Sequence, residues 1–279
     1  MSGDENPFGA AFQVENADGD ARVLLICDHA SNALPAAYDN LGLPPAQLQR
    51  HIAYDIGALA VARLVAQKLY VPLVSAQFSR LLIDPNRGLD DPTLVMKLSD
   101  GALIPANQHI DRFNDYDEWQ RRIDKFYLPY HNAISAALAR AQQADIAPLI
   151  VSIHSFTPIW RGQARPWPIA VLWDKDDRFA AHMRSYMGQL PELALGDNEP
   201  YSGRLKNDTL YRHGTQNGLA HGLVELRQDE IDTADGQGFW AGHVAAMIEQ
   251  ALADPAIGAV TYFGSHTDLP TGPLAAKTL

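Results

Sequence analysis

Side chains suited to catalysis stand at the ends of short apolar runs in this sequence. His29 follows "RVLLIC", His154 lies near the end of "APLIVSIHS", and Glu225 lies within "HGLVELRQD". Two imidazoles and a carboxylate or amide oxygen can bind Zn²⁺ and leave a position for water. A separate glutamate can then take a proton from that water. These three residues therefore indicate a metal-hydrolase site.

Two further groups could recognise a substrate. "DPNR" places Asn86 and Arg87 at the end of another apolar run, and Arg227 follows Glu225 by two positions. Arginine suits this task because its planar guanidinium binds a carboxylate through two parallel hydrogen bonds. The sequence thus adds an anion-binding function to the predicted metal site.

Each motif also has a purely structural interpretation. A histidine at a strand end often caps or supports the chain, and "DPNR" is a common turn sequence. Glu225 stands in the apolar stretch "LVEL", where a carboxylate is costly unless paired, and Arg227 is an available partner. What favours a site is that complementary chemistry recurs at successive strand ends.

The elements that must position these residues follow from the hydrophobic pattern. Near-continuous aliphatic runs are typical of strands that are buried on both faces of a mainly parallel sheet. The predicted strands lie in 22–27, 70–84 (two strands or one kinked strand), 147–155, 166–174 and 221–229. The predicted helices lie in 53–69, 117–143 with a bend near Pro129, 176–190 and 238–254.

Strands that alternate with helices predict a three-layer α/β/α sandwich with a mostly parallel central sheet. Ligands of such sheets collect at the carboxyl ends of the strands, where the polar residues stand. We expect a single domain over 1–279, with loose termini at 1–20 and 267–279. "G-x-S-x-G", "G-x-G-x-x-G" and "G-x-x-x-x-G-K-[ST]" do not occur, which disfavours serine-hydrolase, dinucleotide and P-loop sites.

Composition limits the partners. A net charge of -11 disfavours non-specific binding to nucleic acid or to an anionic membrane surface. No apolar run reaches the roughly 18 residues that a membrane span needs, and the acidic N-terminus lacks the pattern of a secretory signal. The single cysteine, Cys27, excludes an internal disulfide. We expect a cytoplasmic enzyme with a small-molecule substrate, and the oligomeric state stays open.

The ordered motifs resemble the N-formylglutamate amidohydrolase family. The resemblance rests on "CDHASNALP", "HIAYDIGA", "FSRLLIDPNR", "YLPYH", "VSIHSFTP", "NEPYSG" and "VELRQDEI", and it runs from about Val23 to Ile231. It implies a fold like that of the zinc carboxypeptidase and aspartoacylase group, with one zinc ion at the edge of the sheet. Another divalent metal remains an alternative.

The resemblance implies that His29 and His154 are metal ligands. In carboxypeptidase-like relatives a glutamate ligand stands three positions after the first histidine, and here that position is Asn32. The third ligand is then either the amide oxygen of Asn32 or the carboxylate of Asp55 in "HIAYDIGA". We favour Asp55, because a carboxylate suits Zn²⁺ better, and we then expect Asn32 among the substrate-binding residues.

The same resemblance implies roles for the remaining residues. Arg80 would polarise the scissile carbonyl, and Glu225 would act as general base and then as general acid. Asn86 and Arg87 would hold the carboxylate of the substrate. Tyr201 would line the pocket.

Arg227 would either steady Glu225 or contact the substrate. The implied reaction is hydrolysis of N-formylglutamate to formate and glutamate, as in histidine degradation and amino-acid catabolism. One alternative is the same chemistry on another N-acyl amino acid, a peptide or a cell-wall-type amide. Another is a catalytically decayed carboxylate-binding module, in which Asn32 marks the loss of the metal site.

Overall fold

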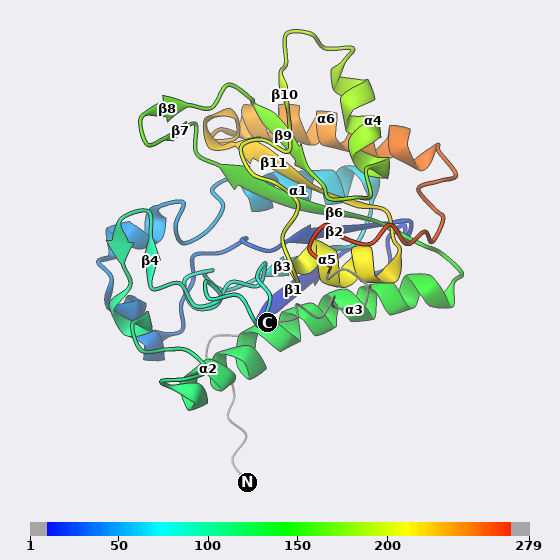
Figure 1. The fold of residues 1–279 in the computed structure, drawn as a ribbon. Helices are drawn as coiled ribbons and strands as arrows, with labels where there is room; N and C mark the ends of the chain where they lie inside the picture. The colour runs from blue at the N-terminus through cyan, green and yellow to red at the C-terminus, as the bar shows by residue number, and fades with distance from the viewer. Residues whose placement is uncertain (1–9, 269–279) are drawn as a thin grey trace, which may run out of the picture.

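The computed structural model describes residues 10–268 and is built on one central seven-stranded sheet (Figure 1). Along the sheet the strands follow the order β1, β3, β2, β6, β11, β9, β10. Their bounds are β1 Phe12–Glu15, β2 Val23–Cys27, β3 Leu73–Ala76, β6 Leu149–Phe156, β9 Ile169–Leu172, β10 Leu195–Asp197 and β11 His221–Arg227. The central strands β3, β2, β6 and β11 are parallel, whereas β1 runs antiparallel to β3 and β9 runs antiparallel to β11. The mostly parallel sheet is confirmed.

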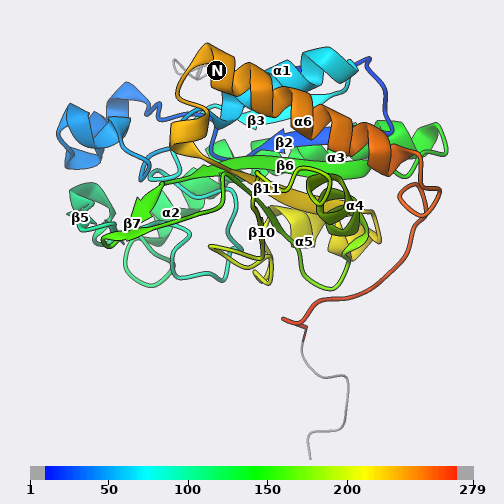
Figure 2. The same ribbon diagram turned by 90° about the horizontal axis from the view of Figure 1, so that it is seen from above.

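Helices cover both faces of this sheet, as the view from above also shows (Figure 2). Their bounds are α1 Ala58–Leu69, α2 Tyr116–Arg122, α3 Leu128–Gln143, α4 Arg178–Met187, α5 Thr209–His213 and α6 Ala234–Leu252. Helices α1, α4 and α6 pack on one face, and α3 and α5 pack on the other. In the described part of the chain, no helix is long and apolar enough to span a bilayer.

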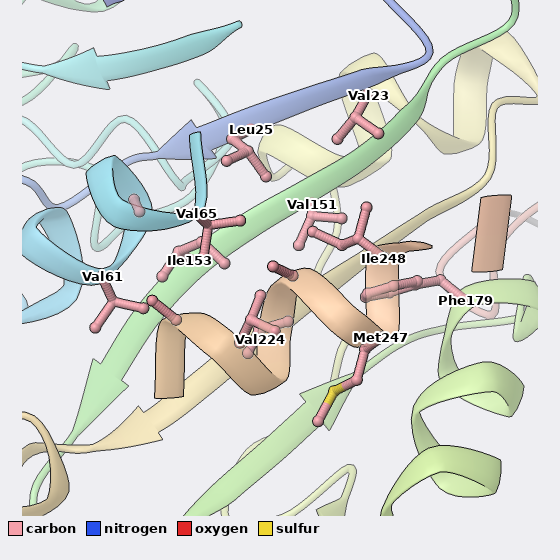
Figure 3. Packing of buried hydrophobic residues seen from close by; sticks show 14 of the residues in the cluster. Val23, Leu25, Val61, Val65, Val151, Ile153, Phe179, Val224, Met247 and Ile248 are labelled. Atoms are coloured by element: carbon pink, nitrogen blue, oxygen red, sulfur yellow. The ribbon is translucent and has the colours of Figure 1, made fainter. Parts of the chain in front are cut away.

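Alternate residues of the strands feed two separate hydrophobic layers. In β2, Val23 and Leu25 point toward α1 and α6, while Leu24 and Ile26 point toward α3. Figure 3 shows the first layer, in which Val23 and Leu25 lie beside residues of β6, β11, α1 and α6. A strand buried on both faces explains why the run "VLLIC" lacks polar alternation.

Two small hairpins extend beyond the carboxyl ends of the central strands. They are β4–β5 (Leu98–Ser99 with Ala102–Leu103) and β7–β8 (Ile159–Trp160 with Gln163–Ala164). Ser99 and Trp160 both line the cavity described below, so each hairpin contributes to its wall.

The expected bend near Pro129 takes a specific form. Helices α2 and α3 are joined by a wider π-helical turn over Ile123–Tyr127, and Pro129 lies in the first turn of α3. Proline has no N–H to donate to the preceding turn, and a π turn is one way in which a helix accommodates such an interruption.

Two sequence-based expectations about strands and termini are wrong. Only Leu73–Ala76 of the run 70–84 is a strand, and residues 77–84 form turns although Phe78 and Leu82 are fully buried. Apolar character there reflects burial of a loop rather than a second strand. The expected loose segment 1–20 contains β1, which pairs with β3. Of the other expected loose terminus, residues 269–279 lie outside the described residues.

Candidate metal centre and active-site cavity

Three side chains converge at the carboxyl end of the sheet. His29 follows β2, His154 lies in β6, and Asp55 precedes α1. A ligand atom from each lies within 4.8 Å of the other two, and all three residues are buried. The centroids of the two imidazole rings are 4.9 Å apart, with the ring planes at 84°. This group can hold a metal ion.

Backbone contacts explain how Asp55 reaches the histidines. Its N–H donates to the carbonyl of His29 at 2.9 Å. Gly57, at φ +82°, then turns the chain into α1, and a Cβ at this position would lie 2.7 Å from the carbonyl oxygen of Ile231. The motif "HIAYDIGA" therefore needs glycine here to bring Asp55 to the sheet edge.

The hydrogen bonds of the two imidazoles direct their Nδ1 atoms toward Asp55. His29 donates from Nε2 to Asp84 at 2.7 Å, and His154 donates from Nε2 to Asp28 at 3.0 Å. Nδ1 of His29 lies 3.4 Å and Nδ1 of His154 lies 2.8 Å from Oδ2 of Asp55. Metal-binding histidines commonly donate their second N–H to a carboxylate in this way.

The residues fit a divalent cation by a further criterion. Nδ1 of His29 is buried and has no hydrogen-bond partner within the described residues, which is costly unless a ligand engages it. Burial raises the pKa of Asp55, but the charges and hydrogen bonds of His29 and His154 outweigh burial and lower it. An ionised carboxylate beside a free imidazole nitrogen suits Zn²⁺, so Asp55 completes the donor set.

His154 is charged when no metal is bound. Burial lowers the pKa of its imidazole, but the hydrogen bonds and charges of Asp28 and Asp55 prevail and raise it to about 10. Both ring nitrogens then carry protons, which Asp28 and Asp55 accept, and a metal ion bound at Nδ1 would have to displace the proton shared with Asp55.

Asp28 and Asp84 contact the two histidines of the metal group, and the sequence interpretation did not include them. Asp28 is fully buried and accepts hydrogen bonds from His154, Ser152, Thr209 and Tyr130 at 2.7–3.0 Å. Its position directly before His29 was the only signal in the sequence, since its donors come from distant elements.

Asp84 joins the metal group to the substrate-recognition loop. Its Oδ1 accepts from His29 and from the backbone N–H of Asn86, and its Oδ2 accepts from Arg80 at 2.8 Å. Burial raises the pKa of Asp84, but Arg80 and His29 outweigh burial and hold it well below its usual range. "DPNR" is therefore a turn as well as part of the site.

Glu225 faces His154 from the neighbouring strand. The two residues are paired in register between β11 and β6, and Glu225 lines the cavity. Its Oε2 atom is buried without a partner in the described structure, and burial raises its pKa to about 7. Such a carboxyl can exchange protons near neutral pH, as general acid–base chemistry requires.

A cavity of about 480 Å³ opens over this group. Of the residues singled out in the sequence, the cavity wall contains His29, Asp55, Arg80, Asn86, Arg87, His154, Tyr201 and Glu225. The side chain of Asn86 is fixed because its Oδ1 accepts from the N–H of Thr209 at 3.2 Å. Arg87 is held by its own carbonyl, which accepts from Tyr127 at 2.8 Å.

Two expected site residues lie outside this wall. Asn32 donates from Nδ2 to the carbonyl of Leu48 at 2.9 Å, so its side chain supports a loop instead of reaching a metal or substrate. Arg227 binds Asp229 and Glu230 at 2.7 and 2.6 Å and makes no ion pair with Glu225 in the described chain. Asp229 and Glu230, which follow β11, hold Arg227 outside the cavity wall. The contacts of Asn32 and Arg227 thus correct the roles that were expected for these two residues.

Fold and site together define an α/β protein with a mostly parallel sheet, whose cavity combines a group able to hold a metal with a buried glutamate and an arginine-bearing wall. A family model described as N-formylglutamate amidohydrolase matches residues 21–231, and the chain belongs to this family. The family is one of hydrolases that act on amide bonds.

Solved structures agree with this assignment. The gene product Atu2144 from Agrobacterium tumefaciens is 35% identical, with a TM-score of 0.83 over 88% of this chain and 96% of that one. An N-formylglutamate amidohydrolase from Ralstonia eutropha JMP134 is 21% identical, with a TM-score of 0.62 over 88% and 98%, and shares the fold. No curated protein sequence matches the chain.

Proposed function

We propose that this protein is a zinc-dependent amidohydrolase of small N-acyl amino acids, with N-formylglutamate as the first candidate substrate. The observation that carries the proposal is the convergence, in one cavity, of the His29–Asp55–His154 group with Glu225 and the Asn86–Arg87 pair. These parts supply metal binding, proton transfer and carboxylate recognition. We place the enzyme in the cytoplasm, in amino-acid catabolism.

His29, Asp55 and His154 would hold the metal, with Asp28 and Asp84 fixing the two imidazoles. A bound Zn²⁺ supplies Lewis-acid chemistry, polarising a carbonyl and acidifying water. Other divalent ions with affinity for nitrogen and oxygen ligands would fit less selectively.

Glu225 is the group that moves the proton. Its buried, unpartnered Oε2 would take a proton from the attacking water and then deliver it to the nitrogen of the leaving amine. Arg80 carries a buried Nε atom without a partner in the described structure, and it would donate to the oxyanion of the tetrahedral intermediate.

Asn86 and Arg87 would bind the carboxylate of the amino acid and hold the amide in register with Glu225. Both stand on a loop whose carbonyls are fixed by Tyr127 and His131. A preorganised clamp of this kind lowers the entropic part of the barrier.

The size of the cavity supports a second candidate within the same chemistry. A volume of about 480 Å³ lies within the range of about 300–1,000 Å³ that is typical of drug-sized ligands. A formyl group is only one carbon with its oxygen, so the cavity admits larger acyl groups. We favour an active enzyme over a decayed carboxylate-binding module, because that alternative rested on Asn32 as a failed ligand and Asp55 would supply the missing carboxylate.

The decisive experiment is an assay of N-acyl amino acids with zinc present and after chelation. We expect hydrolysis of N-formylglutamate, loss of activity with chelator, and recovery when zinc is returned. Faster hydrolysis of N-acetyl or longer N-acyl amino acids would select the second candidate. Metal-independent activity, or binding of every compound without turnover, would refute the proposal.

A further inference from the structure

Arg165 is a buried cation at the edge of the cavity, and nothing in the sequence interpretation required it. It follows strand β8 and is only 8% exposed. Its guanidinium lies over the rings of Phe156, Trp160 and Tyr201, at 5.6, 5.5 and 5.0 Å from their centroids. Three aromatic faces thus enclose one positive charge.

The contacts of Arg165 do not include a carboxylate within residues 10–268. Its Nη1 donates to the carbonyl and hydroxyl oxygens of Thr157, both at 3.2 Å, and its Nη2 donates to the hydroxyl of Tyr201 at 3.1 Å. The neighbouring Arg227, in contrast, is neutralised by two acids. Burying a charge without a counter-charge costs free energy of folding. The position of Arg165 beside Tyr201 is therefore better explained by a role in the site than by a contribution to stability.

Tyr201 lines the cavity together with Asp55 and Glu225, and it is 45% exposed. Within the described residues its hydroxyl accepts from Arg165 and makes no hydrogen bond as a donor. A phenol has one proton to donate, and the approach of Arg165 to its oxygen leaves that proton directed away from the guanidinium. The proton is therefore available to a ligand in the cavity.

We propose that Tyr201 donates a hydrogen bond to the reacting amide of the substrate, and that Arg165 is the positioning residue that aims this proton into the cavity. This inference rests on the proposed hydrolysis of an N-acyl amino acid. It adds a donor from the β7–β8 side of the cavity to that of Arg80. A preorganised donor contributes most where negative charge develops on the amide oxygen. Arg165 polarises the hydroxyl of Tyr201 and so strengthens the hydrogen bond that Tyr201 donates.

The kinetic test is a double-mutant cycle. Loss of one such donor typically lowers kcat by about 10²–10³-fold, so Tyr201→Phe should do so with little change in KM. Arg165→Met should lower kcat about 10-fold, as expected for a residue that acts through another, and the double variant should be no worse than Tyr201→Phe. Additive losses, or a change in KM alone, would overturn the proposal.

The chain offers a matched control in Arg161, which lies on the same hairpin. Arg161 is exposed, and its guanidinium lies 5.7 Å from the centroid of Trp160, which is one of the three rings around Arg165. In the described structure Arg161 makes no hydrogen bond to Tyr201. Arg161→Met should leave kcat unchanged. If Arg165→Met fails to fold, Arg165→Lys keeps a charged donor and should retain most of the activity, whereas total loss in a folded Lys variant would contradict the positioning role.

A readout that needs no turnover separates this inference from the proposed function. Burial raises the pKa of Tyr201, and the charge and hydrogen bond of Arg165 lower it. Ultraviolet titration of the zinc-free protein would measure the pKa of Tyr201, once the titration of the same protein carrying Tyr201→Phe is subtracted. The pKa of Tyr201 should rise in Arg165→Met. It should not change in Arg161→Met. If wild type hydrolyses no N-acyl amino acid, the proposed function fails; an unchanged Tyr201 pKa in Arg165→Met overturns this inference.

Discussion

His154 donates its Nε2 proton to Asp28 at 3.0 Å, and this contact leaves Nδ1 as the nitrogen that faces Asp55 at 2.8 Å. His154 would therefore offer Nδ1 to a metal ion, because a second buried carboxylate binds the other ring nitrogen. His29 has the equivalent arrangement with Asp84. The pairs explain why His29, which follows β2, and His154, which lies in β6, direct the same ring nitrogen toward Asp55.

Replacing Asp28 by Asn should therefore weaken zinc binding. The amide nitrogen of Asn would replace either Oδ2, which accepts from His154 and Ser152, or Oδ1, which accepts from Thr209 and Tyr130, so one pair of donors would lose its acceptor. Loss of such a carboxylate typically costs about 10–100-fold in metal affinity, which competition with a chromophoric chelator would measure. Asp208→Asn is the matched control, since Asp208 lines the same cavity without bonding a histidine, and its zinc affinity should stay unchanged. Equal affinities of Asp28→Asn and wild type would contradict this role.

Glu225→Gln should abolish proton transfer and leave the metal group intact. The expected loss in kcat is about 10²–10⁴-fold, because the side chain keeps its size but no longer accepts a proton. Zinc content by elemental analysis should equal that of wild type. A variant with full activity would exclude Glu225 from the mechanism.

Zinc should stabilise the folded protein. A ligand that binds only the native state at about 100 times its Kd adds about 2.7 kcal/mol, which should raise Tm by several degrees. Scanning calorimetry with zinc and with chelator would measure this shift. His29→Ala and His154→Ala should lose it, because each removes one of three ligands. A zinc-dependent shift that persists in both variants would place the metal elsewhere.

Arg87→Met should act mainly on substrate binding. Arg87 lines the cavity, and its guanidinium makes one long ion pair, with Nε 3.9 Å from Oδ2 of Asp91. Removing a charge-assisted contact that is present in both ground and transition states raises KM, here by about 10–100-fold, and spares kcat. Steady-state kinetics on the best N-acyl amino acid would test this, and a pure kcat effect would contradict it.

Asp208 should make the zinc-free protein less stable as the pH rises from about 4 to about 7. Burial raises its pKa to about 7, so in this window the native state keeps a proton that the unfolded chain has lost. The stabilising contribution of Asp208 is therefore fully present below the window and is lost through it, because above it the ionised carboxylate is buried and repelled by the charge of Asp28.

Asp208→Asn should remove this loss, because Asn stays neutral and still accepts from the N–H of Tyr211 as the N-cap of α5. Relative to wild type, the free energy of unfolding of Asp208→Asn should be almost unchanged at pH 4 and higher by on the order of 1–4 kcal/mol at pH 8. Urea unfolding in the presence of chelator would measure this difference. A pH-independent difference between the two proteins would show that Asp208 does not titrate in this range.

Much of the fold was predictable from the sequence because its signals are local. The apolar runs that became β2, β6 and β11 are buried on both faces, so their composition alone marks them as central strands. Their direction was not predictable, and β9 runs antiparallel to β11 because sheet polarity depends on the path of the connections. Residues 77–84 look like a strand for a related reason, since burial of Phe78 and Leu82 does not reveal whether the backbone is extended.

The residue types and their places in the sequence were enough to indicate which side chains could react: His29, His154 and Glu225 near strand ends, and Asn86–Arg87 in a turn after another run. Their partners became visible only in the folded chain, because those contacts join residues far apart in the sequence. Asp28 meets Thr209 across 181 positions and His154 across 126. The same long-range packing brings Asp55 to His154, binds Asn32 to a loop, holds Arg227 outside the cavity wall and brings Arg165 to Tyr201.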